Sequence, residues 1–143
     1  IVELQDFEHR LDPRMPTGEE IVDAYVSDLK LRCERYDGRI FVAEVDGEVA
    51  GYAAVMTRVR SEELEDGGME YGLVADLAVL NKFRRRGIGR RLMQIAERHA
   101  LDREVRWLRV GVLAANQSAR ELYALLGFHE YQLQLEKDLA ASD

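Results

Sequence analysis

Six basic side chains surround two glycines in the stretch KFRRRGIGRR, residues 82–91. Within it, Arg84, Gly87 and Gly89 have the spacing R-x-x-G-x-G. Glycine lacks a Cβ atom, so an anion can approach the main chain closely, and the first N–H groups of a helix are free donors. A helix that begins at Gly87 would therefore hold a phosphate through its N–H groups and its dipole. The alternative interpretation is a solvated helix start without a ligand.

Two other phosphate motifs fit this stretch less well. The phosphate loop of nucleotide hydrolases needs Lys and then Ser or Thr after its last glycine, whereas Gly89 is followed by Arg90 and Arg91. The dinucleotide motif G-x-G-x-x-G needs a third glycine where the chain has Leu92. The pattern R-x-x-G-x-G is the one that the residues satisfy.

The overall charge limits the class of partner. The 143 residues carry 20 basic and 27 acidic side chains, for a formal net charge of −7. Nucleic acids are bound by broad basic surfaces, so we expect no nucleic acid and no membrane as a partner. The three histidines share no metal-ligand spacing, so we expect no metal. Cys33 is the only cysteine, which fits the reducing cytoplasm.

Helices and strands alternate around the basic stretch. A capping box at Thr17 and Glu20 predicts a helix, and Asp46-Gly47 between apolar runs predicts a tight hairpin turn. In chain order we expect a helix over 17–36, strands over 39–45, 49–59 and 71–80, a helix over 87–102, a strand over 105–112, a helix over 116–126 and a last strand over 129–139. The fold class is therefore α/β (α+β mixed), with one parallel strand pair joined by a right-handed crossover.

Two stretches together resemble the GNAT superfamily of acyl-CoA-dependent N-acetyltransferases. DLAVLNKFRRRGIGRRLM, residues 76–93, looks like the acyl-CoA-binding motif of that family, and NQSARELYALLGF, residues 116–128, matches a second family pattern. The resemblance covers about residues 39–138. It implies a mostly antiparallel central sheet with a splayed parallel strand pair and flanking helices. We expect one domain over residues 1–143, and the family's usual first strand would precede Ile1.

The resemblance implies a role for each matching residue. The N–H groups of the basic loop would hold the pyrophosphate of CoA; its residues are Arg84, Arg85, Arg86, Gly87, Ile88, Gly89 and Arg90. The strand would bulge at Leu77–Val79 and splay from the strand over 105–112, which opens a slot for the pantetheine arm. Leu77 N–H would be an oxyanion donor to the thioester carbonyl, and Val79 would bond the pantetheine amides. Asn116 would contact the cofactor from the other side of the slot.

Tyr123 would lie near the sulfur and act as general acid in the family's pattern. Without the resemblance, a core aromatic on a helix face is the ordinary interpretation of this residue. Two glutamate positions that serve some members as general base are occupied here by Leu73 and Gly111, which disfavours histone-type and N-terminal acceptors. Asp76 is the only charge in YGLVADLAVL and is the candidate base. Glu70, Glu44 and a water chain are the alternatives.

The function that these observations favour is N-acetyl transfer from acetyl-CoA, as cosubstrate, to a primary amine of a small molecule or peptide, by direct attack in a ternary complex. Deprotonating a lysine-like amine of pKa ~10.4 at neutral pH costs roughly 4 kcal/mol, and an α-amine of pKa ~8 about 1 kcal/mol. The base therefore matters most for strongly basic acceptors. One alternative is a non-catalytic acyl-CoA-sensing module on the same fold. Another is a nucleic-acid-binding domain that uses RRRGIGRR. A homodimer is an option that the sequence leaves open.

Overall fold

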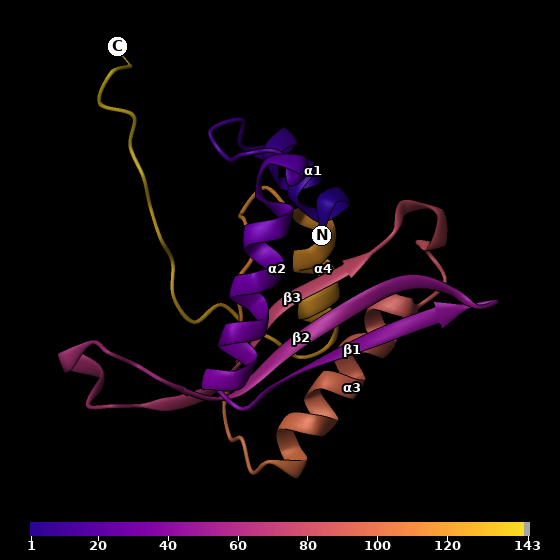
Figure 1. The fold of residues 1–143 in the computed structure, drawn as a ribbon. Helices are drawn as coiled ribbons and strands as arrows, with labels where there is room; N and C mark the ends of the chain where they lie inside the picture. The colour runs from indigo at the N-terminus through magenta and orange to yellow at the C-terminus, as the bar shows by residue number, and fades with distance from the viewer. Residues whose placement is uncertain (142–143) are drawn as a thin grey trace.

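The computed structural model describes residues 1–141 and has a four-stranded sheet with helices on both faces (Figure 1). The elements, in chain order, are α1 (Val2–Leu11), α2 (Gly18–Arg35), β1 (Gly38–Val45), β2 (Glu48–Arg60), β3 (Glu70–Val79), α3 (Ile88–Asp102), β4 (Leu108–Val110) and α4 (Gln117–Leu125), with 3-10 turns η1 (Leu64–Asp66) and η2 (Asn81–Phe83). The last two residues of the expected domain, 142–143, lie outside the described part. Within that part, none of the helices is both long and apolar enough to span a bilayer.

The strands lie in the order β1-β2-β3-β4, with β1, β2 and β3 antiparallel to one another and β4 parallel to β3. This confirms the expected mixed sheet. Asp46 and Gly47 both have positive φ angles, 50° and 78°, as a two-residue hairpin turn requires, and Val45 pairs with Glu48 across it. The predicted helix after the prolines is also confirmed, and the Thr17 N–H donates to Glu20 Oε2 at 2.7 Å in its capping box.

The parallel pair β3–β4 is short and then separates. Only the three residues 72–74 of β3 pair with β4, so the rest of β3, from Ala75 to Val79, has no partner on that side. The strand predicted over 105–112 is therefore reduced to Leu108–Val110. The register of β3 against β2 also shifts, because Ala54 pairs with Asp76 while Val55 pairs with Val74. Ala75 is thus a β-bulge, two residues before the expected position at 77–79.

Two apolar cores lie on opposite faces of β2. Val55 and Val74 pack with α3 and α4 on one face, and Ala54 and Met56 pack with Leu29 of α2 on the other. Val55, Ala54 and Met56 are consecutive on β2 and fully buried, so this central strand is apolar on both sides. The sheet is thereby held rigidly beneath the point where β3 leaves β4.

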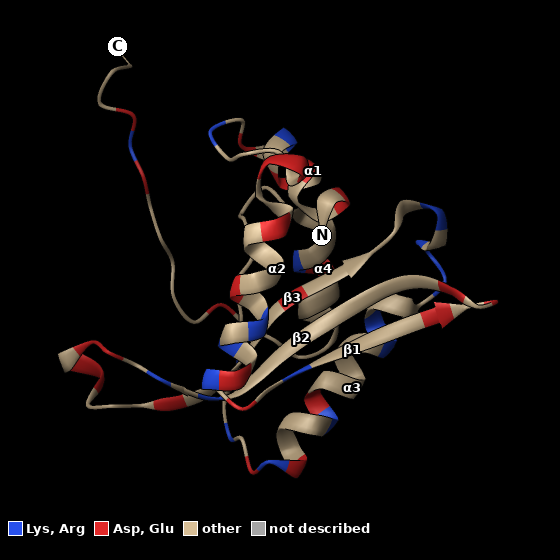
Figure 2. Cartoon of the chain, in the orientation of Figure 1, with Lys and Arg blue, Asp and Glu red and all other residues tan. Residues whose placement is uncertain are grey.

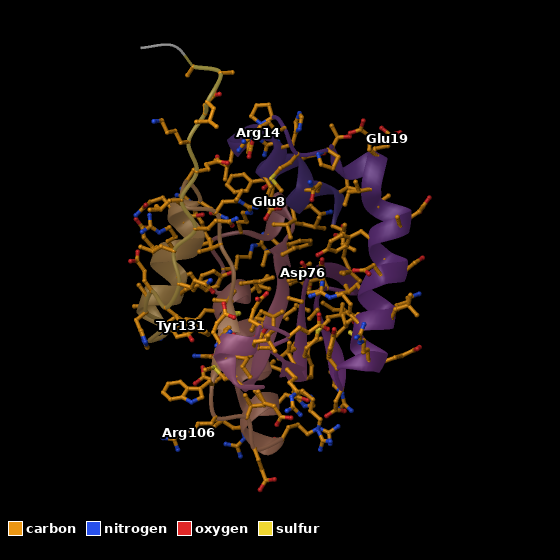
Figure 3. All side chains as sticks on the ribbon, turned by 90° about the vertical axis from the view of Figure 1, so that its left-hand side faces the viewer. Glu8, Arg14, Glu19, Asp76, Arg106 and Tyr131 are labelled. Atoms are coloured by element: carbon orange, nitrogen blue, oxygen red, sulfur yellow. The ribbon has the colours of Figure 1, made fainter. Side chains whose placement is uncertain are left out.

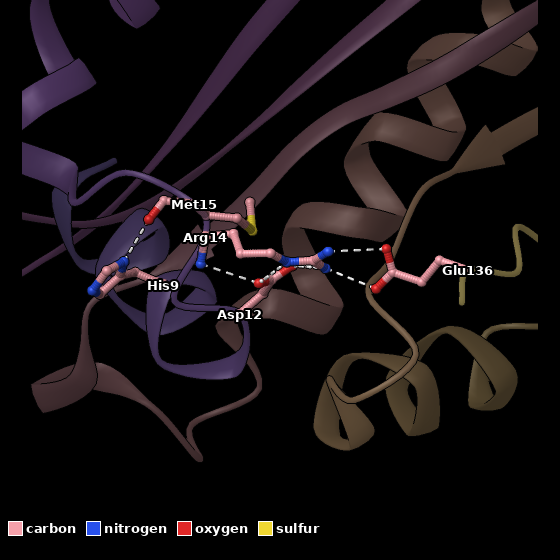
Figure 4. Close-up of polar contacts among 5 residues, drawn as sticks. All are labelled: His9, Asp12, Arg14, Met15 and Glu136. Carbon is pink, nitrogen blue, oxygen red and sulfur yellow. Dashed lines mark hydrogen bonds and ion pairs between the residues drawn. The ribbon is translucent and has the colours of Figure 1, made fainter. Parts of the chain in front are cut away.

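The prediction of a last strand over 129–139 is wrong. The segment is extended but pairs with no strand among the described residues, and Leu135 is 89% exposed. Alternation of apolar and polar residues predicts a half-buried strand only where a partner strand exists, and β4 pairs over three residues only. Arg14 instead joins this segment to the α1–α2 loop, since its guanidinium donates to Glu136 and to Asp12 at 2.7 Å each (Figure 4). The Arg14 and Glu136 side chains are exposed to solvent, so their ion pair is screened.

The core under α2 can be tested with a matched pair on one helix. Leu29 is 3% exposed against β2, whereas Leu31 is 63% exposed two residues later. We expect Leu29→Ala to lower the free energy of unfolding by about 2–5 kcal/mol, because it removes buried methyl groups and leaves a cavity. Leu31→Ala should stay within about 0.5 kcal/mol of the wild type. Urea denaturation measures both, and equal losses would contradict the assigned faces of α2.

Candidate active site

The unpaired half of β3, from Ala75 to Val79, presents main-chain donors on the side where β4 no longer pairs with it. Leu80 N–H donates to the carbonyl of Ala50 on β2 at 2.8 Å, and donors alternate in direction along a strand. Ala78 N–H therefore points to β2, while those of Leu77 and Val79 point to the side that β4 has left. Two residues predicted to meet the cofactor thus have N–H groups available at one edge.

The start of α3 is a second group of free donors. Gly87, its N-cap, is left-handed with a φ of 76° and no side chain caps the helix. The first intrahelical bond runs from Arg91 N–H to Gly87 O, so the N–H groups of Ile88, Gly89 and Arg90 are not used inside the helix. Arg85 is also left-handed, at 63°. Such successive turns direct N–H groups to one point and favour an anion.

The basic side chains of this loop gather where those donors begin. Figure 2 shows the loop between β3 and α3 coloured blue, whereas Asp and Glu gather on α1 and the first turns of α2. Arg84 Nε donates to Val79 O at 3.3 Å, and its guanidinium lies over the Phe7 ring. The Arg86 guanidinium lies over the Phe83 ring. These two side chains lie along the loop, so their charge complements the main-chain donors.

Asp76 is 7% exposed and accepts hydrogen bonds from two tyrosines. Tyr25 Oη of α2 donates at 2.5 Å and Tyr52 Oη of β2 at 2.9 Å. Burial raises the pKa of Asp76, although both hydrogen bonds favour its charged form. Burial and the Asp76 carboxylate also raise the pKa of both tyrosines. The bulge at Ala75 turns Asp76 to the face of α2, whereas Leu77 packs in the core on the other face.

Tyr123 of α4 packs in the core with Val55 and Val74, on the sheet face opposite to the one where Tyr25 and Tyr52 pack. Its side chain is 9% exposed, and its hydroxyl makes no hydrogen bond with any residue from 1 to 141. Burial, then the Glu8 carboxylate and then Asp76, raise the pKa of Tyr123 to about 12. The phenol therefore stays protonated at neutral pH. Its ring meets Phe128 edge to face, so Tyr123 is a core aromatic whose hydroxyl is available to donate a hydrogen bond.

Glu8 belongs to none of the motifs in the sequence. It is half-buried on α1, a helix that was not predicted, and burial together with Asp76 raises its pKa. In Figure 3, Glu8 lies between Arg14 and Asp76 in projection. Glu8 and Asp76 are 68 positions apart in the sequence. No local motif signals it.

The other predicted residues, Asn116, Glu70 and Glu44, lie in three different parts of the fold. Asn116 is the N-cap of α4, and its Oδ1 accepts from Ala119 N–H at 3.2 Å, which leaves its amide nitrogen as a donor. Glu70 begins β3, at the far end from Asp76. Glu44 lines a groove of about 380 Å³ between β1 and α3, which contains neither Leu77 nor Tyr123. The structure therefore does not bring these two alternative bases to the unpaired edge of β3.

Within residues 1–141, no group of three or more His, Cys, Asp or Glu side chains is arranged to hold a metal ion.

Comparison with known proteins was made by sequence and by structure. The model of the acetyltransferase (GNAT) family matches residues 4–128. An N-alpha-acetyltransferase of Sulfurisphaera tokodaii is 36% identical over 107 residues, which are 70% of this chain and 62% of that protein. An uncharacterized N-acetyltransferase of Archaeoglobus fulgidus is 36% identical over 85 residues, 59% of this chain and 56% of that protein. The chain thus spans only about three fifths of the length of these curated relatives.

Solved structures share the fold at lower identity. One from Pyrococcus furiosus, which carries a provisional acetyl transferase name, has a TM-score of 0.73 at 20% identity and covers 97% of this chain and 91% of its own. The aminoglycoside N-acetyltransferase AAC(6')-Iy, in complex with a CoA-containing bisubstrate analog, has a TM-score of 0.67 at 20% identity over 94% of this chain and 87% of its own. At these identities the likeness concerns the fold.

The raised pKa of Asp76 has a consequence for stability. A carboxyl that binds its proton more tightly in the folded state stabilises the fold below its unfolded pKa, near 3.8, and loses that contribution as pH rises through the folded value. Between pH 4 and 7 we therefore expect the wild type to lose stability that Asp76→Asn does not lose. Urea unfolding across this range measures the gap. Asp23→Asn, an exposed control on α2, should run parallel to the wild type, and a parallel profile for Asp76→Asn would contradict the assignment.

Proposed function

The chain belongs to the acetyltransferase (GNAT) family, and from this premise we propose that it transfers the acetyl group of acetyl-CoA to a primary amine in a ternary complex. The observation that carries the proposal is the separation of β3 from β4 directly beside an uncapped helix start. It supplies free N–H groups along one edge and at one helix end, which suits an extended ligand that terminates in phosphates.

Residues along the loop and β3 would contact the successive parts of CoA, from its pyrophosphate to its pantetheine arm. The loop residues Arg84, Arg85, Arg86, Gly87, Ile88, Gly89 and Arg90 would hold the pyrophosphate through main-chain donors and positive charge. Val79 would bond an amide of the pantetheine arm. Its carbonyl would then accept a hydrogen bond from that amide in place of the one that it accepts from Arg84 Nε. The amide nitrogen of Asn116 would donate from the opposite wall, because its oxygen is engaged in capping α4.

Acetyl-CoA supplies a thioester carbonyl that an amine can attack. The N–H of Leu77 would donate to the carbonyl oxygen as negative charge develops there. Tyr123 would donate to the sulfur as it leaves. Its pKa of about 12 exceeds the ~8.5 of a cysteine-like thiol, so full proton transfer from the phenol to the thiolate is uphill. We therefore assign Tyr123 the role of hydrogen-bond donor first and of general acid second.

The acceptor would enter from the side of α1 and α2, where Asp76 and its tyrosines lie. This surface is acidic, so it favours a cationic amine. Amines of small molecules belong to this class, and so do peptide α-amines, although Gly111 at a family glutamate position disfavours the latter. Among the similar proteins, an N-alpha-acetyltransferase supports a peptide α-amine and an aminoglycoside N-acetyltransferase supports a small-molecule amine. A cytoplasmic place of action agrees with the single thiol of Cys33.

Acetyl transfer is tested with the purified protein and acetyl-CoA. Release of free thiol is measured with a panel of amines that includes a tetrapeptide with a free alanine α-amine and an aminoglycoside, and mass spectrometry identifies the product. A product heavier by one acetyl group supports the proposal. Tight acetyl-CoA binding without thiol release across the panel would favour the sensing module instead.

The phosphate loop is tested by Gly89→Glu. An ideal Cβ at Gly89 would lie 3.7 Å from the Leu122 and Val79 side chains, which is ordinary contact, so the variant should fold. Its carboxylate would repel the pyrophosphate, and we expect CoA binding by calorimetry to be lost. Gly87 is less suitable, because its positive φ strains any side chain there. Gln94→Glu adds the same charge to an exposed position of α3 and should bind CoA normally. Unchanged affinity in a folded Gly89→Glu protein would reject the loop's assignment.

Tyr123→Phe separates binding from chemistry. It removes one hydroxyl and keeps the ring against Phe128, so the CoA affinity should stay constant while kcat falls by about 10²-fold. Tyr131→Phe, in the exposed C-terminal segment, is the matched control and should leave kcat unchanged. A Tyr123→Phe protein with wild-type turnover would return Tyr123 to a purely packing role.

A further inference from the structure

Two phenols from two different layers of the fold hold the carboxylate of Asp76. Tyr25 Oη of α2 donates to its Oδ1 at 2.5 Å, and Tyr52 Oη of β2 donates to its Oδ2 at 2.9 Å. Asp76 is 7% exposed, whereas both tyrosines are only partly buried. The carboxylate is thus less accessible than the residues that bond it. A proton from outside reaches Asp76 most directly through one of the two hydroxyls.

Asp76 lies in the half of β3 that β4 has left. It follows the bulge at Ala75 and directly precedes Leu77, the proposed oxyanion donor, and consecutive Cα atoms are only about 3.8 Å apart. Its two tyrosines pack on the face of α2, whereas Tyr123 packs on the opposite face with α3 and α4. An amine that attacks from the face of α2 would therefore meet a base there, while sulfur leaves toward the other face.

The two phenols approach Asp76 from different places. Tyr52 lies within the sheet and pairs with Ala78 across β2 and β3, so it bonds Asp76 from the side of β3 that remains closed. Tyr25 bonds it from the helix layer, near the acidic start of α2 (Figure 2), and its hydrogen bond is the shorter of the two. A cation that the acidic start of α2 attracts is therefore closer to Tyr25 than to Tyr52.

A phenol can pass a proton without being consumed. Tyrosine has one O–H donor, and its oxygen also accepts. Tyr25 directs its proton to Asp76, so its lone pairs stay available to an N–H group of a ligand. Transfer along this line moves a proton from the ligand to the buried carboxylate, and the acceptor does not have to displace either tyrosine.

We propose that Tyr25 is a catalytic residue that takes a proton from the acceptor ammonium and passes its own hydroxyl proton to Asp76, and that Tyr52 is a positioning residue that holds Asp76. This rests on the proposed acetyl transfer at the same site. As one N–H proton moves to Tyr25 Oη, the hydroxyl proton moves to Asp76 Oδ1, and the freed lone pair of nitrogen forms the new N–C bond. The C–S bond breaks with its electron pair going to sulfur, and the thiolate takes a second proton from nitrogen. Reverse transfer through Tyr25 then delivers the proton of Asp76 to water.

The electrostatics of the cluster support the relay. Burial raises the pKa of Asp76, which makes its carboxylate a stronger base, while both phenol bonds lower that pKa. Burial and Asp76 raise the pKa of Tyr25, so its phenol stays protonated and can only pass a proton. The other charged or titratable groups that interact electrostatically with Asp76 are Arg32 and Cys33 of α2, Glu8 of α1, the ammonium of Ile1 and Tyr123 of α4.

The first experiment removes one hydroxyl at a time and measures kcat/KM for the alanine tetrapeptide as a function of pH. In the wild type it should rise as Asp76 loses its proton. Tyr52→Phe should move this rise to higher pH, because the charged form of Asp76 loses a hydrogen bond, with little change in rate above it. Tyr25→Phe should lose about 10²-fold near neutral pH and keep its acetyl-CoA affinity. Tyr36→Phe, in the same core, removes a hydroxyl away from Asp76 and should match the wild type.

The pH dependence of the loss distinguishes a relay from a packing role. Above about pH 8 an α-amine is largely free, so it needs no base, and the loss in Tyr25→Phe should shrink there. A structural defect would give the same loss at every pH. A constant loss, or one common pH profile for Tyr25→Phe and Tyr52→Phe, would overturn the role of Tyr25.

The second experiment uses the wild type without turnover. In protein with ¹³C-labelled tyrosine and bound CoA, addition of the alanine tetrapeptide should shift the Cζ resonance of Tyr25, because an ammonium then donates to its oxygen. The Cζ resonance of Tyr36 should stay in place. Calorimetry confirms that the peptide is bound. A bound peptide that leaves the Tyr25 resonance unmoved would also overturn the relay.

The outcomes separate the two proposals. A wild-type protein that binds acetyl-CoA and acetylates neither the tetrapeptide nor the aminoglycoside overturns the proposed function. A wild type that acetylates the tetrapeptide, together with a folded Tyr25→Phe protein of equal rate at every pH, overturns only the relay. If Tyr25→Phe does not fold, the tyrosine resonances of the wild type still decide.

Discussion

The end of hydrogen bonding between β3 and β4 at Val74 is the constraint on which the site depends. Up to that residue the two strands pair in parallel, and beyond it β3 continues alone. The bulge at Ala75 shifts the alternation of the strand by one residue. In a regular strand Asp76 would face the core of α3 and α4, and Leu77 would lie under α2. One extra residue therefore directs the carboxylate to one face and frees the N–H of Leu77 at the edge.

The cluster around Asp76 shows how a sheet can hold a carboxylate in its interior. Transfer of a charge from water to an apolar interior is costly unless the charge is hydrogen-bonded or paired. Tyr25 and Tyr52 supply the hydrogen bonds but no positive charge, so Asp76 keeps a raised pKa. Arg32 and the ammonium of Ile1 act on this carboxyl from a distance, and within residues 1–141 it forms no ion pair. A compensating basic residue in place of either tyrosine would stabilise the protein and would also weaken the pull on a cationic ligand.

Local patterns predicted the parts of the fold that local interactions determine. The capping box at Thr17, the Asp46-Gly47 turn and the glycine-marked start of α3 each depend on a few consecutive residues, and each is present. The basic loop was found for the same reason, as was Asp76, since a single charge in an apolar strand is visible in the sequence. The roles given to these residues at the site stay predictions.

Sequence patterns did not predict the features that depend on residues far away in the chain. The segment 129–139 alternates like a strand, but alternation says nothing of whether a partner strand is available, and β4 offers three paired residues. The position of α1 depends on the contacts of Glu3 with Asn81 and of Phe7 with Arg84, which lie 78 and 77 residues apart in the sequence. α1 has Leu4, Phe7 and Leu11 at helical spacing but no capping motif in its first turn and no fully buried side chain, so only contacts with other elements distinguish it as a fixed part of the fold. Burial by other elements decides such features, and no short motif records it.

The absence of buried side chains in α1 (Val2–Leu11) bears on how this architecture can diversify. Substitutions in a helix that contributes no side chain to either core change folding stability little, so such a helix can accumulate changes under weak purifying selection. The strand edge and the loop that would receive the acyl donor are, by contrast, continuous with the rigid sheet. Acceptor preference can therefore evolve as a nearly separate module, by drift and selection along ten residues, while the donor half of the protein stays constant.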